Sequence, residues 1–214
     1  MTRGKQTILI LAGALALGLG LWLGQLLTRP PVEPPAISGI LFSEPKEIDD
    51  FTLRDQAGQP FHRDRFSGKW TFLYFGYTYC PDVCPLTLFE LAKVQQQLVQ
   101  KNGDQETAYM LISVDPQRDT PQRLGEYTRY FNPKFSGATG TPEELSKLAQ
   151  QFGVIYSRSP AQENEANYTI DHSSTVILID PNARLHAIFT PPHTPEAMVS
   201  DFAKIREHYR LKNH

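Results

Sequence analysis

The sequence predicts a three-layer α/β domain with a mixed sheet, preceded by one transmembrane helix. Apolar runs at 70–75, 108–114 and 175–179 predict buried strands, and segments with helical spacing lie between and after them. The apolar run 8–27 holds no formal charge, which predicts the membrane helix. With 214 residues, 40% of them hydrophobic, and two cysteines, the chain is neither a disordered polypeptide nor a disulfide-dense miniprotein.

The N-terminal segment is expected to have three parts: a short cytoplasmic N-terminus at 1–7, a transmembrane anchor at 8–27 and a proline-rich linker at 28–39. Twenty residues at about 1.5 Å each span about 30 Å, the thickness of the hydrocarbon core of a bilayer. Arg3 and Lys5 precede the run, so the positive-inside rule places the N-terminus in the cytoplasm. A cleaved signal peptide is the alternative. The length of the run and the lack of an Ala-x-Ala site favour an uncleaved anchor.

The remaining residues, 40–214, are expected to form one domain. The whole chain has a formal charge of −2, and removing Arg3, Lys5 and Arg29 leaves 18 basic against 23 acidic residues, or −5. This balance gives no indication of nucleic-acid binding. The small negative charge is weak support for a partner with a basic patch.

The first half of the domain predicts a hairpin, two strands and a helix. The segment 48–61 predicts a short β-hairpin. The continuous apolar run 70–75 is typical of a strand buried on both faces, and 108–114 predicts a second such strand. Between them, 86–99 carries apolar residues at helical spacing.

Two further helices begin with the same signal. Thr120 and Thr141 are each predicted to cap a helix N-terminus, with a proline at the first helical position. The first of these helices begins at Pro121, and the second ends at Phe152.

The C-terminal part predicts a hairpin and a closing helix. The segment 175–179 predicts a strand, 185–189 its antiparallel return, and 195–209 a helix. The order of the elements matches a thioredoxin-like fold with an extra N-terminal β-hairpin. The fold alone does not determine a function.

The two cysteines follow the first buried strand and open the helix after it. Cys80 and Cys84 are four residues apart, so they stack on one face if this turn is helical. The unpaired N–H groups and dipole of a helix N-terminus favour thiolates, which copper binding and disulfide exchange both require. A structural disulfide is the other interpretation, although so short a loop gives little stabilisation.

A two-thiolate site for a soft metal is commonly completed by an imidazole. Five of the six histidines lie in polar or terminal segments and are expected on the solvated surface: His62, His186, His193, His208 and His214. His172 lies just before the strand 175–179, in a loop that a thioredoxin-like layout places opposite the cysteine helix. It is either a metal ligand or a hydrogen-bonded structural histidine.

A third notable stretch, 112–121, follows the second buried strand. Its Asp115 and Asp119 are either turn and cap residues or direct participants in the site. Arg118 is a candidate for orienting a carboxylate or meeting a partner. Asp171 precedes His172 and is either a supporting or a surface group.

Together these stretches resemble the Sco/SenC family, copper-binding proteins that assist cytochrome c oxidase assembly. Residues 76–85 match its Gly-[Phe/Tyr]-Thr-x-Cys-Pro-Asp-x-Cys-Pro pattern, 113–121 its Ser-Val-Asp-Pro-x-Arg-Asp-Thr-Pro, and 171–173 its Asp-His-Ser. The resemblance covers about residues 40–210. The chain departs from the family's Asp-Pro-x-Gly at 180–183, where alanine replaces the glycine of a turn.

The resemblance implies that Cys80 and Cys84 bind a copper ion, as Cu(I) or Cu(II), and that His172 completes the site. The same cysteines can act as a catalytic redox pair. The implied recipient is the binuclear copper centre of cytochrome c oxidase subunit II, with an upstream copper donor and a thiol reductant as further partners. The expected location is the bacterial inner membrane, with the domain in the periplasm, because no Arg- and Ser-rich mitochondrial presequence is present.

The leading hypothesis is a copper metallochaperone that passes its metal to a partner by ligand exchange. A thiol–disulfide reductase that keeps the subunit II cysteines reduced is the enzymatic alternative, and a redox or copper sensor would use the same site. The Cys-x3-Cys spacing and His172 favour metal binding. A peroxiredoxin-like peroxidase is disfavoured because the chain has no Pro-x3-Thr-x2-Cys arrangement.

Overall fold

The computed structural model describes residues 3–27, 33–159 and 168–213. The N-terminal unit is built on helix α1 (Arg3–Leu27), in which Gly4–Gly24 is long and apolar enough to cross a membrane, with a mean hydropathy of 2.1. A signal sequence meets the same criteria. Part of the predicted linker, residues 28–32, lies outside the described residues. The second unit is the domain Pro34–Arg210.

An eight-stranded mixed sheet forms the middle of the domain, with strand order β1-β10-β9-β4-β5-β6-β2-β3. Strands β4, β5 and β6 run parallel to one another, and the other neighbouring pairs are antiparallel. The strands are β1 (Ile40–Glu47), β2 (Leu53–Asp55), β3 (Pro60–Phe61), β4 (Trp70–Gly76), β5 (Thr107–Ser113), β6 (Phe135–Thr139), β9 (Val176–Ile179) and β10 (Arg184–Phe189).

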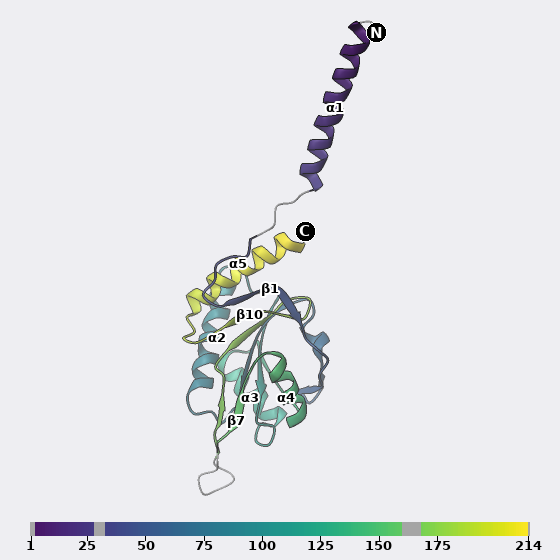
Figure 1. Ribbon diagram of the computed structural model, residues 1–214. Helices are drawn as coiled ribbons and strands as arrows, with labels where there is room; N and C mark the ends of the chain where they lie inside the picture. The colour runs from purple at the N-terminus through teal and green to yellow at the C-terminus, as the bar shows by residue number, and fades with distance from the viewer. Residues whose placement is uncertain (1–2, 28–32, 160–167, 214) are drawn as a thin grey trace. The chain divides into compact units, whose positions relative to one another are not determined.

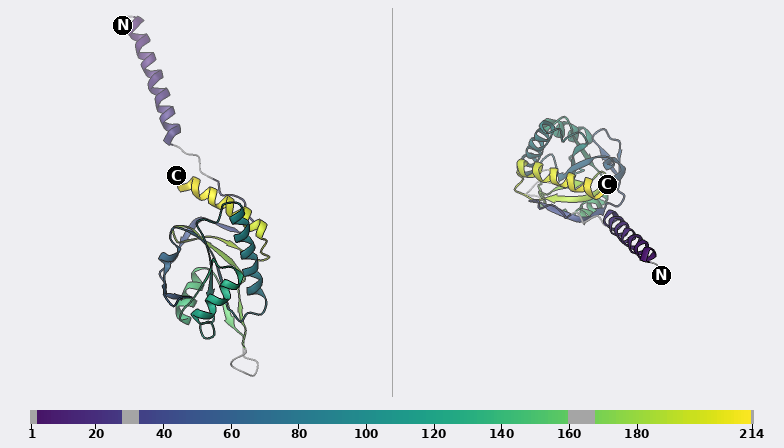
Figure 2. Two further views of the ribbon diagram at one scale, coloured as in Figure 1. Left: turned by 180° about the vertical axis from the view of Figure 1, so that it is seen from behind. Right: turned by 90° about the horizontal axis from the view of Figure 1, so that it is seen from above.

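Helices cover both faces of this sheet (Figure 1). They are α2 (Val83–Gln100), α3 (Pro121–Phe131), α4 (Pro142–Gln151) and α5 (Pro195–Asn213), with a 3-10 turn at Arg63–Phe66. Helices α2 and α5 lie side by side in both side views (Figure 1, Figure 2), and Gln97 donates a hydrogen bond to Glu196 at 3.0 Å. The ring of Phe72 packs on Phe202 of α5, whereas Phe75 contacts Phe152 at the end of α4. Alternate side chains of β4 therefore face opposite helical layers.

The predicted α/β class, the mixed sheet and its main elements are confirmed. The hairpin β2–β3 is present, and β2 also pairs with β6. The side chains of Thr120 and Thr141 accept hydrogen bonds from the N–H groups of Arg123 and Glu144, as the capping signals predict. Helix α2 begins three residues earlier than predicted, and α5 extends beyond the predicted end at 209.

The prediction of a loop around His172 was wrong. This residue ends strand β8 (Ile170–His172), which pairs with β7 (Tyr156–Arg158) in a separate two-stranded ribbon. The structure also contains β1 and β6, which the sequence analysis did not predict. These segments are short or partly polar, and their pairing with distant strands makes them extended.

Strand β4 leaves no room for a side chain at Gly76. A Cβ atom there would lie 2.9 Å from Cys84 Sγ, 2.9 Å from a ring carbon of Tyr74 and 3.2 Å from Leu111. We expect Gly76→Ala to lower the free energy of unfolding by about 1–3 kcal/mol through overpacking. Urea unfolding of the full chain in detergent measures this.

The matched control for this overpacking is Gly103→Ala. Its added Cβ would meet nothing closer than 3.4 Å, an ordinary contact distance. We expect a smaller loss for this control. Equal stabilities of the two variants would contradict the close packing between β4 and Cys84.

Candidate metal centre

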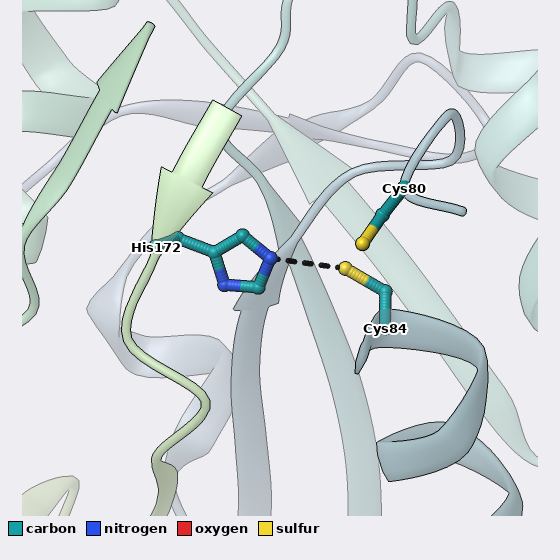
Figure 3. Close-up of side chains that lie close together, drawn as sticks. All are labelled: Cys80, Cys84 and His172. Atoms are coloured by element: carbon teal, nitrogen blue, oxygen red, sulfur yellow. Dashed lines mark hydrogen bonds between the residues drawn. The ribbon is translucent and has the colours of Figure 1, made fainter. Parts of the chain in front are cut away.

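Both cysteines lie at the carboxyl end of β4. Cys80 is in the loop after this strand and is partly exposed, whereas Cys84 is in the first turn of α2 and fully buried. Both thiols are free, and their sulfur atoms point into the same space (Figure 3). The helix begins at Val83, so Cys84 has a backbone N–H that belongs to the unpaired set of the helix N-terminus.

His172 reaches the same space from strand β8 (Figure 3). Its Nε2 lies 3.1 Å from Cys84 Sγ, and the two sulfur atoms and a ring nitrogen all lie within 4.8 Å of one another. Its Nδ1 lies 3.2 Å from the carbonyl oxygen of Ser173. A hydrogen bond donated there by Nδ1–H leaves the Nε2 lone pair directed at the sulfur atoms, as a metal ligand requires.

The two thiols differ strongly in acidity. A hydrogen bond from the Cys84 thiol lowers the pKa of Cys80 to about 3, aided by the N–H groups of Asp82 and Cys84, although burial acts in the opposite direction. Burial raises the pKa of Cys84 far above its ordinary range, and its hydrogen bond to Cys80 raises it further. The metal-free pair is therefore a Cys80 thiolate that accepts a hydrogen bond from a Cys84 thiol.

A model of the SCO1/SenC family matches residues 43–207. The chain belongs to the SCO1/SenC family. A SCO2-like protein from Rickettsia conorii is 34% identical over 192 residues, which cover 89% of this chain and 93% of that protein. The family resemblance seen in the sequence is thus confirmed.

Solved structures from this family share the fold. Arabidopsis thaliana ScoI with copper bound has a TM-score of 0.68 and 34% identity, over 74% of this chain and 98% of that one. Bradyrhizobium japonicum ScoI with copper bound has a TM-score of 0.65 and 33% identity, over 76% and 99% of the two chains. These likenesses confirm the predicted thioredoxin-like architecture.

Asp119 supports the cysteine side of the centre. Its buried carboxylate accepts hydrogen bonds from the Thr78 N–H at 2.9 Å, the Thr78 hydroxyl at 2.6 Å and the Ser113 hydroxyl. Arg123 donates to the same Thr78 hydroxyl at 2.6 Å. Burial raises the pKa of Asp119, and the hydrogen bonds from Ser113 and Thr78 act against that rise. Asp119 thus holds the turn that leads to Cys80, and does not lie among the candidate ligands.

Asp115 supports the histidine side. It is buried, forms an ion pair with Arg118 and accepts a hydrogen bond from the Tyr168 hydroxyl. Asp171, by contrast, is exposed and accepts a hydrogen bond from the Ser159 hydroxyl at 3.1 Å. In the sequence, Asp115 and Asp119 cannot be told apart from turn and cap residues, nor Asp171 from a surface group.

The expectation of a solvated surface was wrong for His186. This residue is 5% exposed, its Nδ1 lies 3.2 Å from an Asp180 carboxylate oxygen, and its ring meets Trp70 and Tyr209 edge-on. The remaining histidines vary: His62 is exposed, His193 and His208 are partly buried, and His214 lies outside the described residues. The burial of His186 follows from these contacts with Asp180, Trp70 and Tyr209, which the segment 185–189 taken alone does not reveal.

The acidity of Cys80 gives a pH-dependent prediction. Because its pKa lies near 3, Cys80 is already a thiolate at about pH 5, and its fraction ionised does not change up to pH 8. We expect the alkylation rate of metal-free protein by iodoacetamide to be flat over this interval. Mass spectrometry should place the adduct on Cys80.

The variant Cys84→Ala tests the cause of this acidity. It removes the hydrogen-bond donor that contributes most, so the rate profile should shift to higher pH. The test compares how the alkylation rate depends on pH in the two chains, and not the absolute rates. Absolute rates also reflect intrinsic nucleophilicity, which falls as the pKa of a thiol falls. A rate in the unmodified chain that rises tenfold per pH unit would contradict the assignment.

Proposed function

We propose that this protein is a membrane-anchored copper metallochaperone for cytochrome c oxidase assembly. The observation that carries the proposal is the convergence of Cys80 Sγ, Cys84 Sγ and a ring nitrogen of His172 within 4.8 Å of one another. Two thiolates suit Cu(I), and the added imidazole nitrogen suits Cu(II) as well. Copper is bound in the related structures from Arabidopsis thaliana and Bradyrhizobium japonicum.

In this proposal copper is cargo that leaves by ligand exchange. Cys80 is the more exposed sulfur, so an incoming thiolate of the partner first replaces this ligand. Cys84 and His172 retain the ion until further partner ligands replace them. The metal-loaded state has both sulfurs as thiolates, so copper binding releases the proton that Cys84 carries.

The proposed recipient is the binuclear copper centre of oxidase subunit II, supplied from an upstream copper donor, with a thiol reductant to keep the cysteines reduced. We place the protein in the bacterial inner membrane with the domain in the periplasm. Helix α1 supports the anchor, and Arg3 and Lys5 support a cytoplasmic N-terminus.

The unequal thiols favour thiol–disulfide reduction as a second candidate function. Cys80 thiolate attacks a partner disulfide, forms a mixed disulfide and releases one partner thiolate. Cys84 then loses its proton and attacks Cys80 Sγ, which releases the second partner thiolate and leaves a Cys80–Cys84 disulfide. The partner gains the two electrons that the cysteine pair loses. A redox or copper sensor would use the same chemistry.

The variant His172→Ala separates these two functions. We expect copper affinity to fall by more than the roughly 10–100-fold that loss of a supporting group costs, because a direct ligand is removed. Reaction with a small aromatic disulfide should remain largely intact. Competitive Cu(I) titration and the rate of disulfide reduction provide the two measurements, with the exposed His62→Ala as control. Unchanged copper affinity would remove His172 from the site.

Copper titration of the reduced, full-length chain in detergent tests the proposal itself. We expect one tightly bound equivalent. The copper(II) form should show a sulfur-to-copper charge-transfer band, and Cys80→Ala and Cys84→Ala should each abolish it. A chain that retains no copper but reduces disulfides would be assigned to the reductase function.

A further inference from the structure

The ribbon that carries His172 lies outside the main sheet. In the described part of the chain, strands β7 and β8 pair over Tyr156–Arg158 and Ile170–His172 as a separate two-stranded sheet. An isolated two-stranded ribbon is marginally stable, so its position depends on contacts with the rest of the domain. The distance between the histidine and the cysteines therefore depends on what fastens this ribbon.

Arg118 contacts the histidine side of the site in two ways. Its Nη1 donates a hydrogen bond to the Tyr168 carbonyl at 3.0 Å, and its guanidinium carbon lies 3.6 Å from the centre of the Tyr168 ring. The Tyr168 hydroxyl in turn donates to Asp115, which is the ion-pair partner of Arg118. Tyr168 lies two residues before β8, so these contacts hold the start of that strand.

The same guanidinium contacts the cysteine side. Its central carbon lies 4.7 Å from the ring centre of Tyr79, the residue before Cys80, and 5.8 Å from that of Tyr77. Tyr77 reinforces the link, because its hydroxyl accepts a hydrogen bond from the Ile170 N–H at 3.1 Å. The Arg118 side chain is only 15% exposed, so little solvent competes with these contacts.

We propose that Arg118 is a positioning residue that fastens the His172 ribbon to the Cys80 loop and so keeps the three candidate ligands together before metal arrives. The inference deepens the proposed function and rests on it for the metal-bound consequence. A planar guanidinium can hydrogen-bond Asp115 and Tyr168 while stacking on aromatic rings, whereas a lysine ammonium supplies charge without this geometry. Lysine at this position should therefore preserve the ion pair with Asp115 and lose the clamp.

The first test uses the metal-free, full-length chain in detergent and measures amide hydrogen exchange by NMR. The reporter is the Ile170 N–H, which bonds to Tyr77 across the two halves of the site. We expect Arg118→Gln and Arg118→Lys each to speed its exchange at least tenfold relative to the amides of β4. The matched control is Arg123→Gln. Arg123 also stacks on Tyr79, at 4.0 Å, but its hydrogen bond is to Thr78 on the cysteine side, so Ile170 exchange should not change.

Three outcomes of the experiments on the Arg118 variants overturn the inference. Unchanged Ile170 exchange in both Arg118 variants shows that the ribbon is fastened without it. An Ile170 exchange rate in Arg118→Lys equal to that of the unmodified chain shows that Arg118 acts only by neutralising Asp115. An equal rise in the exchange rates of Ile170 and of the β4 amides shows a general loss of stability of the domain. If the Arg118 variants do not fold, Tyr79→Leu removes the exposed end of the clamp, and it should speed Ile170 exchange about threefold. An unchanged rate in that variant also overturns the inference.

The second test asks what the clamp does to bound copper. We expect the EPR spectrum of the copper(II) form to lose nitrogen hyperfine structure in Arg118→Lys while sulfur ligation persists. Retained nitrogen structure in this variant would contradict the metal-bound consequence. A native chain that binds no copper would refute the proposed function alone, because the exchange experiment needs no metal.

Discussion

Burial of β4 on both faces is the constraint on which the site depends. Every residue of Trp70–Gly76 is buried, between the parallel strand β5 and the antiparallel strand β9. A shift of one residue would exchange the two faces of the strand, so its register is fixed by packing. Because β9 is antiparallel, its start lies beside the end of β4, with Val176 opposite Tyr74. The chain just after β4 therefore meets the chain just before β9, and these are the segments that carry the cysteines and His172.

Two buried carboxylates that follow β5 hold these two segments in place. Asp119 holds the turn before Cys80 through Thr78, and Asp115 holds Arg118 and Tyr168 on the histidine side. A buried charge is costly unless it is paired or hydrogen-bonded: Asp115 has an ion pair with Arg118, and Asp119 accepts three hydrogen bonds from Thr78 and Ser113. Each acid thus fixes one half of the site without lying among the candidate ligands. Asp115 and Asp119 are four residues apart in the loop after β5, so one loop holds both the cysteine side and the histidine side of the site.

Signals confined to one segment were sufficient for the elements that frame the site. The apolar run of β4, the helical spacing of α2 and the Thr-Pro starts of α3 and α4 each reflect local physics, and the structure confirms them. Strands β1, β6 and β8 could not be predicted in this way, because pairing with distant segments makes them extended. The same limit applies to His186, whose burial depends on Asp180 and on rings from β4 and α5. The proposed ligands were found through their motif and their position, whereas the supporting role of Asp115 is visible only in the fold.

One proton shared by two unequal thiols connects the two proposed activities. Copper loading requires both sulfurs as thiolates, so the metal displaces the proton that Cys84 donates to Cys80. Disulfide exchange requires the same proton to leave when Cys84 attacks the mixed disulfide. Burial raises the pKa of Cys84 and opposes both steps. The imidazole nitrogen of His172, 3.1 Å from this sulfur, favours copper loading as the proposed metal ligand. The site is thus built around the buried sulfur, and what the partner brings to Cys80, a copper ion or a disulfide, selects the reaction.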